Sequence, residues 1–416
     1  MRKQRKQPTR RRGSRPLSTF AALRNSNYRF YWFGLICYVL GYRAEYVTYA
    51  WIVWELTRDP LYLGYLGLAQ GVPLIVFQLW GGVLADRMNR LRLLLVTQVG
   101  TALTLTATLT LILGGHVGVE MMLALAAASS VFRAFDEPSR LSLIPELVER
   151  QHLSNAIALG SLPWQAGRMI GPSITGVLIA AFGGTAGFVM AVAASYAALA
   201  LYSRLRVSGE APGSHGQHAI RQFAEGVTFV ARNFVFLNLT CLALFNALFG
   251  LSYVTLLPIY ADAYFHTGSA GYGLLQALHG TGALIGTLTI ATVAGRIARP
   301  GRALLLGALV MGLGLMAFSQ TRTIGMALPV LLVVGFSNTF YLTQVSTFIQ
   351  QNVPDHIRGR VLSLYSLCWN LLPLGGLIGG VLAAAVDARF AVLVGGALVT
   401  ANAVVLMTSK RLRAIR

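Results

Sequence analysis

A short charged turn links two long apolar segments of the chain: Gly82-Val83-Leu84-Ala85-Asp86-Arg87-Met88-Asn89-Arg90-Leu91-Arg92. A related turn, Gly295-Arg296-Ile297-Ala298-Arg299, follows 209 residues later. A turn this short holds no domain of its own, so its charges must act where two helices meet. The stretch therefore predicts the cytoplasmic face of a membrane helix bundle that contains an internal repeat.

The composition of the chain supports a membrane protein. Of the 416 residues, 55% are hydrophobic and 12% charged, whereas about a quarter of a soluble domain is charged. A membrane-spanning helix needs about 20 apolar residues, and twelve segments qualify: 30–56, 62–85, 93–114, 118–135, 155–181, 184–203, 235–261, 271–294, 303–319, 324–349, 361–386 and 388–408. Backbone groups in lipid must be paired within the segment, so an all-α integral membrane fold with twelve transmembrane helices is predicted. The apolar runs do not alternate, which excludes an outer-membrane barrel.

The positive charges predict the topology. The net charge is +20, and 29 of the 34 Lys and Arg residues lie in the two tails and in the turns 86–92, 133–150, 204–232, 295–302 and 350–360. The loops on the other side hold only Arg58, Arg322 and Arg389. By the positive-inside rule both termini are cytoplasmic, and the protein lies in the cell (cytoplasmic) membrane as a multi-pass protein.

The first residues form a basic arm. Met1–Arg15 carries eight basic residues and no acidic one. We interpret it as a disordered segment attracted to anionic lipid, because no folded module that reads nucleic acid accompanies it. The apolar run that follows is too long for a cleavable signal peptide. The three cysteines lie far apart, and no metal site or cofactor is predicted.

A second repeat fixes the domain organisation. The segment His152-Leu153 to Gly176-Val177-Leu178 matches His356-Ile357 to Gly380-Val381-Leu382, at an offset of 204 residues. We expect two pseudo-symmetric six-helix halves with a substrate site between them near the bilayer midplane. The expected boundaries are a basic arm at 1–29, the halves at 30–203 and 235–408, a cytoplasmic linker at 204–234 and a basic tail at 409–416.

These motifs resemble the major facilitator superfamily. The turn is similar to the superfamily's signature Gly-x-x-x-Asp-Arg-x-x-x-Arg, from which Asn89 and Leu91 depart. The segments 138–147, 155–159 and 168–172 resemble the branch with the enterobactin exporter, macrolide efflux pumps and the lysophospholipid transporter. The resemblance implies a monomeric secondary active transporter that exports small amphipathic molecules, such as drugs or siderophores, by alternating access and proton antiport.

One predicted helix carries a pattern of small residues. Gly167, Gly171, Pro172 and Gly176 resemble the fifth-helix motif of antiporters in this superfamily, although Thr175 stands where a second Gly is usual. Small residues let two helices approach closely, and a proline inside a helix removes one hydrogen bond and bends it. Ordinary close packing is the alternative interpretation.

The resemblance also implies a role for the charged turn. It places Asp86 near the start of the eleventh helix, around 358–361, and Arg87 or Arg90 could pair with an acid at the end of the fourth span. Charge-assisted pairs of this kind form in one state and break in another. The hypothesis is a conformational latch that favours the outward-open state, and its residues are Gly82, Asp86, Arg87, Arg90, Asp136 and Glu137. The alternative is charge that only sets topology.

Three ionisable residues lie inside predicted spans: Arg43, Glu45 and Arg168. Such residues are costly in lipid and commonly functional. Arg43 and Glu45 are two residues apart and face different sides of a helix, so a Glu45–Arg168 pair is possible and would leave Arg43 free. We expect Glu45 to couple transport to protons and Arg43 to contact an anionic substrate; a purely structural pair is the alternative. Polar residues of the second half, such as Gln276 and His279, are expected to hydrogen-bond across helices.

The energy source and the rival functions follow from what the sequence lacks. It has no Walker loop, and Lys occurs only at positions 3, 6 and 410, so ATP is not the expected driver. It has no His-Glu-x-x-His and no Gly-x-Ser-x-Gly motif, so no enzyme is expected. The expected energy source is therefore an ion gradient, carried by protons. The alternatives are a lysophospholipid flippase without a proton requirement, and a non-transporting membrane sensor or assembly factor.

Overall fold

The computed structural model describes residues 21–207, 219–293, 296–297 and 299–413, without the side chains of 79–87, 219–224 and 355–356. All regular elements in this part of the chain are helices. The longer ones are α1 (Ser26–Thr57), α2 (Pro60–Arg87), α3 (Arg90–Leu113), α4 (Val119–Leu147), α5 (Leu153–Phe182), α6 (Gly184–Tyr202), α7 (Ala219–Arg232), α8 (Phe234–Phe245), α9 (Tyr253–Ile259), α10 (Gly268–Val293), α11 (Pro300–Ser319), α12 (Ile324–Asn352), α13 (Asp355–Asn370), α14 (Leu372–Ala385) and α15 (Ala388–Thr408). The short ones are η1 (Ala21–Arg24), η2 (Arg150–His152), the π-helices η3 (Asn246–Gly250) and η4 (Tyr260–Tyr264), and α16 (Lys410–Arg413).

Each apolar segment predicted from the sequence falls on a helix or on a run of consecutive helices. Segment 235–261 is built from α8, η3, α9 and η4, and segment 361–386 from α13 and α14. Within the described residues, nine helices or runs are long and apolar enough to cross a membrane. Three further helices, α1, α4 and α5, are 32, 29 and 30 residues long but are not among these nine.

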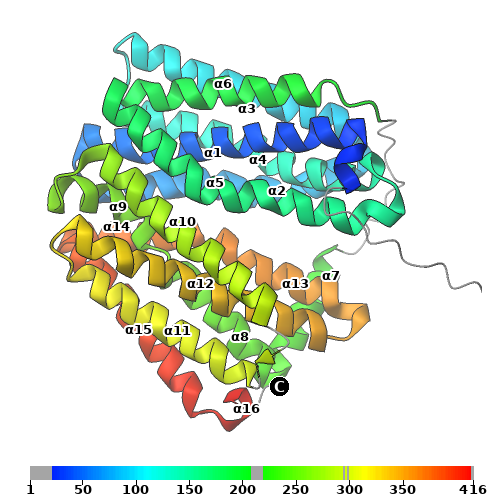
Figure 1. Ribbon diagram of the computed structural model, residues 1–416, viewed down its shortest axis with the longest axis vertical. Coiled ribbons are helices and arrows are strands. Elements are labelled where there is room, and N and C mark those ends of the chain that lie inside the picture. The colour runs from blue at the N-terminus through cyan, green and yellow to red at the C-terminus, as the bar shows by residue number, and fades with distance from the viewer. Residues whose placement is uncertain (1–20, 208–218, 294–295, 298, 414–416) are drawn as a thin grey trace, which may run out of the picture.

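The helices are arranged in two groups (Figure 1). Helices α1 to α6 form the upper group, which we call the N-terminal bundle; α8 to α15 form the lower group, the C-terminal bundle. Within the first, α1 packs against α5 and α6, and α2 against α4. Within the second, α10 packs against α12 and α11 against α15. The main contacts between the bundles are α5 with α10 and α2 with α14.

Glycines allow these two contacts to be very close. A Cβ atom on Gly176 of α5 would lie 2.8 Å from the Cα of Gly273 on α10. A Cβ atom on Gly380 of α14 would lie 2.8 Å from the carbonyl oxygen of Pro60, at the start of α2. Both sites are near the end of the molecule where α1 passes into α2. We call it the far end, and the opposite one, where α1 begins and α15 finishes, the terminal end. The bundles are therefore joined backbone to backbone at the far end.

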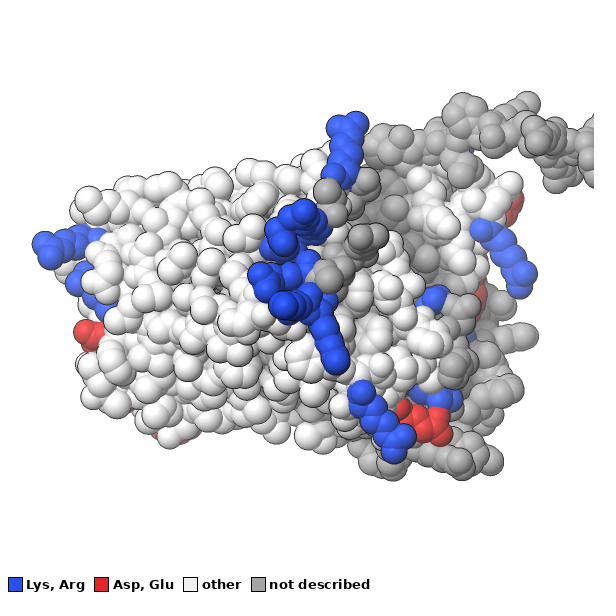
Figure 2. All heavy atoms as spheres, turned by 90° about the horizontal axis from the view of Figure 1, so that it is seen from below, with Lys and Arg blue, Asp and Glu red and all other residues white. Residues whose placement is uncertain are grey.

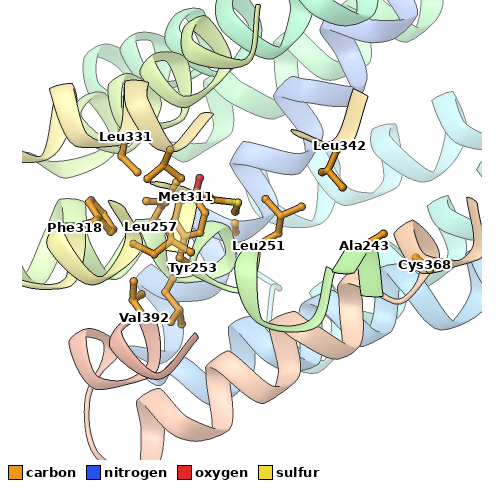
Figure 3. Close-up of a cluster of buried hydrophobic side chains, with 14 of the residues drawn as sticks. Ala243, Leu251, Tyr253, Leu257, Met311, Phe318, Leu331, Leu342, Cys368 and Val392 are labelled. Atoms are coloured by element: carbon orange, nitrogen blue, oxygen red, sulfur yellow. The ribbon is translucent and has the colours of Figure 1, made fainter. Parts of the chain in front are cut away.

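Burial in the C-terminal bundle comes from aromatic and aliphatic side chains (Figure 3). Tyr253 of α9, Met311 and Phe318 of α11, and Val392 of α15 lie together there. The rings of Tyr260 and Phe318 stack with their centroids 4.5 Å apart. Such packing holds the interrupted α8–η4 segment in place and fixes the position of Tyr253, which faces the interior.

The surface separates charge from apolar side chains. Many large hydrophobic side chains are exposed, among them Leu103, Val177 and Leu288. Seen from below, most of the visible Lys and Arg side chains gather around the C-terminal residues and toward the terminal end, and an uncharged surface separates them from a few charges at the far end (Figure 2). An apolar belt of this kind suits a lipid surround rather than water.

Candidate functional site

A buried ion pair joins α1 and α4 in the middle of the N-terminal bundle. Oε2 of Glu45 lies 2.7 Å from a terminal guanidinium nitrogen of Arg133, and their side chains are 1% and 9% exposed. The hydroxyl of Ser129 donates a 2.7 Å hydrogen bond to the other carboxylate oxygen. The guanidinium of Arg133 also lies over the ring of Tyr42, 5.0 Å from its centroid. Both charges are thus removed from water and depend on each other.

This geometry corrects the pairing considered for Glu45. The sequence allowed a Glu45–Arg168 pair, and that pairing is wrong, because Glu45 faces α4 and binds Arg133. Arg43, two residues earlier, faces α5: its Cβ would lie 2.6 Å from a Cβ on Gly171. The two side chains leave α1 in different directions, as the 100° spacing of helical residues requires.

A second ion pair lies two turns further along α4. Asp136 is 2.8 Å from Arg140, four residues on, and both side chains are almost completely buried. The amide of Gln98 on α3 donates a 2.5 Å hydrogen bond to Asp136. The guanidinium of Arg140 lies over the rings of Tyr38 and Trp164, at 4.4 and 5.3 Å. Helix α4 therefore carries one ion pair to α1 and one internal ion pair, whose two members contact side chains of α1, α3 and α5.

The other ionisable residues predicted inside the membrane, Arg43, Arg168 and His279, lie away from these two ion pairs. Arg43 is half-buried and Arg168 is exposed. Within the C-terminal bundle, the hydroxyl of Tyr253 on α9 lies 2.7 Å from Nδ1 of His279 on α10. The next residue on α10, Gly280, touches α5, because its Cβ would lie 2.5 Å from the carbonyl oxygen of Arg168. The expectation that His279 bonds across helices is confirmed by its contact with α9.

The small-residue pattern of α5 serves two interfaces. Gly167 and Gly171 pack closely against α1, since a Cβ on Gly167 would lie 2.4 Å from a methyl group of Val39. Gly273 of α10 packs against Gly176 and against the backbone of Pro172. A Cβ on Gly273 would lie 2.5 Å from the carbonyl oxygen of Pro172. One face of the motif thus holds the N-terminal bundle together, and its last turn meets the other bundle.

The latch residues are placed only in part. The side chains of Gly82, Asp86 and Arg87 lie outside the described residues. Arg90 does not pair with Asp136 or Glu137 as expected. It lies 2.8 Å from Glu146 and donates a hydrogen bond to the carbonyl of Ser142.

The physical reason is the length of α4. The predicted span stopped at residue 135, whereas the helix runs through Pro138 and Pro145 to Leu147 and brings Glu146 to the terminal end. Asp136 is left inside the bundle with Arg140, and Glu137 is exposed.

A polar cluster at the far end was not predicted from the sequence. Asp262 of η4 forms an ion pair with Arg58, the residue that follows α1, and accepts a 3.0 Å hydrogen bond from the indole of Trp54. We call these three residues the far-end cluster. It joins the N-terminal bundle to the C-terminal bundle. Only the tertiary structure brings Asp262 to α1, because 204 residues separate it from Arg58 in the chain.

Arg133 and Arg140 are the functional candidates that the sequence did not single out. Arg133 lies among the last residues of the predicted span 118–135 and Arg140 beyond it, and both fall in the stretch 133–150 that the charge pattern assigns to a turn. A signal was present, since Arg133, Asp136 and Arg140 are spaced three and four apart, as on one helix face. Continuing the helix through Pro138 would have placed all three inside the bundle.

Comparisons with known proteins agree with this architecture. The profile of the transmembrane secretion effector family matches residues 17–416. The staphyloferrin A transporter of Staphylococcus aureus is 23% identical over 79% of this chain and 82% of its own. The multidrug efflux pump Tap of Mycobacterium tuberculosis is 27% identical over 87% and 88%. A bacterial homologue of the lysosomal transporter Spinster, solved in an inward-facing, occupied conformation, has the same fold, with a TM-score of 0.72, 15% identity and coverage of 96% and 98%.

Proposed function

Because the chain belongs to the transmembrane secretion effector family of the major facilitator superfamily, we propose that it exports small amphipathic molecules, such as drugs or siderophores, by alternating access and proton antiport. Membership makes it a multi-pass membrane transporter rather than an enzyme. The relative named as a multidrug efflux pump supports the direction of transport, and it and the relative named as the staphyloferrin A transporter support the class of cargo.

The observation that carries the proposal is the Glu45–Arg133 pair. A carboxylate that is 1% exposed is stable in its charged form only while a cation and hydrogen-bond donors surround it. A proton on Glu45 would cancel its charge and release Arg133. The freed guanidinium must then find another partner or move toward water, which changes the packing of α4 against α1. Proton binding and a change in helix packing are thereby linked through one contact.

The arrangement of the bundles supports an alternating-access cycle. If both termini are cytoplasmic, as the charge distribution predicts, the far end faces outward. The backbone contacts Gly176–Gly273 and Gly380–Pro60, together with the far-end cluster, then close the protein to the outside. We propose that the six-helix halves 30–203 and 235–408 rock around the midplane, with the linker 204–234 joining them. The latch around Asp86 would hold them together at the terminal end in the outward-open state.

The test is proton movement in everted membrane vesicles that contain the protein. Macrolides, dyes, siderophores and lysolipids are added separately, and the vesicle lumen pH is followed with a fluorescent reporter. We expect a cargo-dependent proton efflux that Glu45→Gln abolishes. The matched control is Glu120→Gln, which changes an exposed glutamate of α4 and should leave the efflux intact.

The other outcomes favour the rival functions. A lysolipid that crosses the bilayer equally well with and without a proton gradient would favour the flippase. A correctly inserted protein that moves none of the cargo classes would favour a sensor or assembly factor.

A further inference from the structure

Three helices bring hydrogen-bond donors and positive charge together where the two bundles meet. Arg43 comes from α1, Arg168 from α5, and Gln276 and His279 from α10. We call these four residues the donor cluster. Gly171 packs directly on the side chain of Arg43, and Gly280 packs on the backbone of Arg168, so the three helices are in close contact at this level. Gln276 and His279 are three residues apart and share one side of α10.

The charges of the cluster are not balanced within the described side chains. A Cβ on Gly167, the residue before Arg168, would lie 4.0 Å from Cγ of Arg43, so the two arginines project from neighbouring turns of packed helices. At this spacing their like charges repel each other, and His279 lies in the field of both. The nearest acid in sequence, Glu45, is turned away and bound to Arg133. The two arginines have no ion-pair partner among the described carboxylates; Arg43 has only the ring of Tyr42, 5.3 Å away. Two guanidinium groups without an ion-pair partner are costly between membrane helices unless an anion joins them.

The hydrogen bonds of the cluster are also incomplete. Nε of Arg43 is buried and has no acceptor. Nε2 of Gln276 is buried without an acceptor as well, in a side chain that is only 9% exposed. Buried donors are nearly always satisfied in folded proteins, so donors without a partner call for a missing acceptor. An oxyanion supplies several acceptor sites at once.

The cluster can be reached from outside the protein interior. Arg168 is exposed and His279 half-buried, although both lie well inside their helices. His279 is held in place from two sides, by the hydroxyl of Tyr253 and by Gly335, whose Cβ would lie 2.1 Å from the His279 carbonyl oxygen. The site thus combines fixed donors with an accessible guanidinium.

We propose that the donor cluster binds a carboxylate group of the transported molecule, so that the cargo is an organic anion. This rests on the proposed function, since it names the substrate class of that transporter. The planar guanidinium of an arginine matches a carboxylate with two parallel hydrogen bonds. A carboxylate bound here would cancel the repulsion between Arg43 and Arg168. It would also bridge α1 and α5 of one bundle to α10 of the other.

The test is equilibrium binding to the full-length protein in nanodiscs, without any proton gradient. The probe is tricarballylate, a small tricarboxylate, measured by calorimetry, and the control ligand is its uncharged trimethyl ester. We expect Arg43→Gln and Arg168→Gln each to weaken binding about tenfold or more, because each loses a charged hydrogen bond. Arg322→Gln, which changes an exposed arginine in the turn before α12, should bind as the wild type does.

Further variants separate recognition from folding. Arg43→Lys keeps the charge but not the planar pair of donors, so it should bind more weakly than wild type and more tightly than Arg43→Gln while melting as wild type does. Equal binding of the ester and the tricarboxylate would overturn the proposal. So would tighter binding of inorganic phosphate, or unchanged affinity in both glutamine variants.

Glu45→Gln keeps this test apart from that of the proposed function. It should still bind tricarballylate, because Glu45 lies outside the donor cluster, even where it abolishes proton efflux. Proton-coupled export of a neutral or cationic dye by a protein that binds no carboxylate would refute the anion site and leave the exporter standing. Carboxylate binding without any proton response would do the reverse.

Discussion

The indole nitrogen of Trp54 on α1 donates a 3.0 Å hydrogen bond to the carboxylate of Asp262 on η4. The same carboxylate pairs with Arg58, whose guanidinium lies 5.7 Å from the centre of the Trp54 ring. Two side chains of the N-terminal bundle therefore meet at one acid of the C-terminal bundle. Since α1 and η4 belong to different bundles, any motion that opens the far end must break this contact.

Replacing that acid should open the far end. A hydrogen bond to a charged group contributes about 1.5–3 kcal/mol, so Asp262→Asn should raise the population open at the far end about tenfold. Spin labels at Leu56 and Ala263, both exposed, would report the distance between α1 and η4 after the native cysteines are replaced. Glu55→Gln, at an exposed acid of α1, is the control. An unchanged distance distribution in Asp262→Asn would show that the cluster does not hold the far end closed.

The close contact of α5 with α10 predicts a sharp size limit at Gly176. A Cβ there would lie 2.7 Å from the carbonyl oxygen of Ser269 and 2.8 Å from the Cα of Gly273, closer than real Cβ atoms come. Backbone cannot move aside cheaply, so Gly176→Ala should prevent full closure and abolish most transport while the protein still inserts. Gly160→Ala is the matched control on the same helix, because no atom lies within 4 Å of its Cβ. Wild-type transport by Gly176→Ala would mean that this contact is not part of the cycle.

The two ion pairs of α4 with its neighbours should differ in their effect on stability. Arg133→Gln leaves Glu45 buried without its cation, which costs about 3–5 kcal/mol. Arg90→Gln frees a glutamate whose side chain is 22% exposed and can be hydrated, so the cost should be about 1 kcal/mol or less. Melting temperatures in detergent, measured side by side, check the order. Glu45→Gln combined with Arg133→Gln should regain most of the loss; a double variant as unstable as Arg133→Gln would show that the pair itself is not responsible.

The charged turn yields a prediction that rests on sequence alone. Asp86→Asn removes the negative charge expected to hold the terminal end together, so transport should fall severalfold while the amount of protein in the membrane stays the same. Uptake into everted vesicles, normalised to the protein inserted, measures it. Glu149→Gln, an exposed acid of the turn after α4, should have no effect. Full activity in Asp86→Asn would reduce the turn to a topology signal.

The helices could be predicted from the sequence because burial in lipid imposes one solution on an apolar run. The runs from residue 93 to 114 and from 388 to 408 coincide with α3 and α15 to within a few residues. The prediction failed where a helix carries polar side chains that neighbouring helices cover. Helix α4 is the example, since it continues past residue 135 to Leu147. Hydropathy counts a buried, paired Arg133 as exposed charge, and this is why the two buried ion pairs of α4 were not predicted.

The sequence predicted some of the residues that form the candidate site, but not the residues that they contact. Arg43, Glu45 and Arg168 stood out because charge inside an apolar run is rare and costly. Their partners depend on which helices pack together: Glu45 faces Arg133, and Arg43 faces Gly171. The sequence fixes only how side chains leave one helix, not which helix they meet.

By itself, the sequence of this protein determined that the chain forms a set of apolar helices with its positive charge concentrated in turns and tails, because lipid excludes unpaired backbone and unpaired charge. The tertiary structure alone decided that Glu45 pairs with Arg133, that Asp262 reaches Trp54, and that Arg43 packs against Gly171 of α5. Those contacts join residues that lie tens to hundreds of positions apart. They exist only because particular helices pack against each other, which is a property of surfaces that fit each other and not of local sequence.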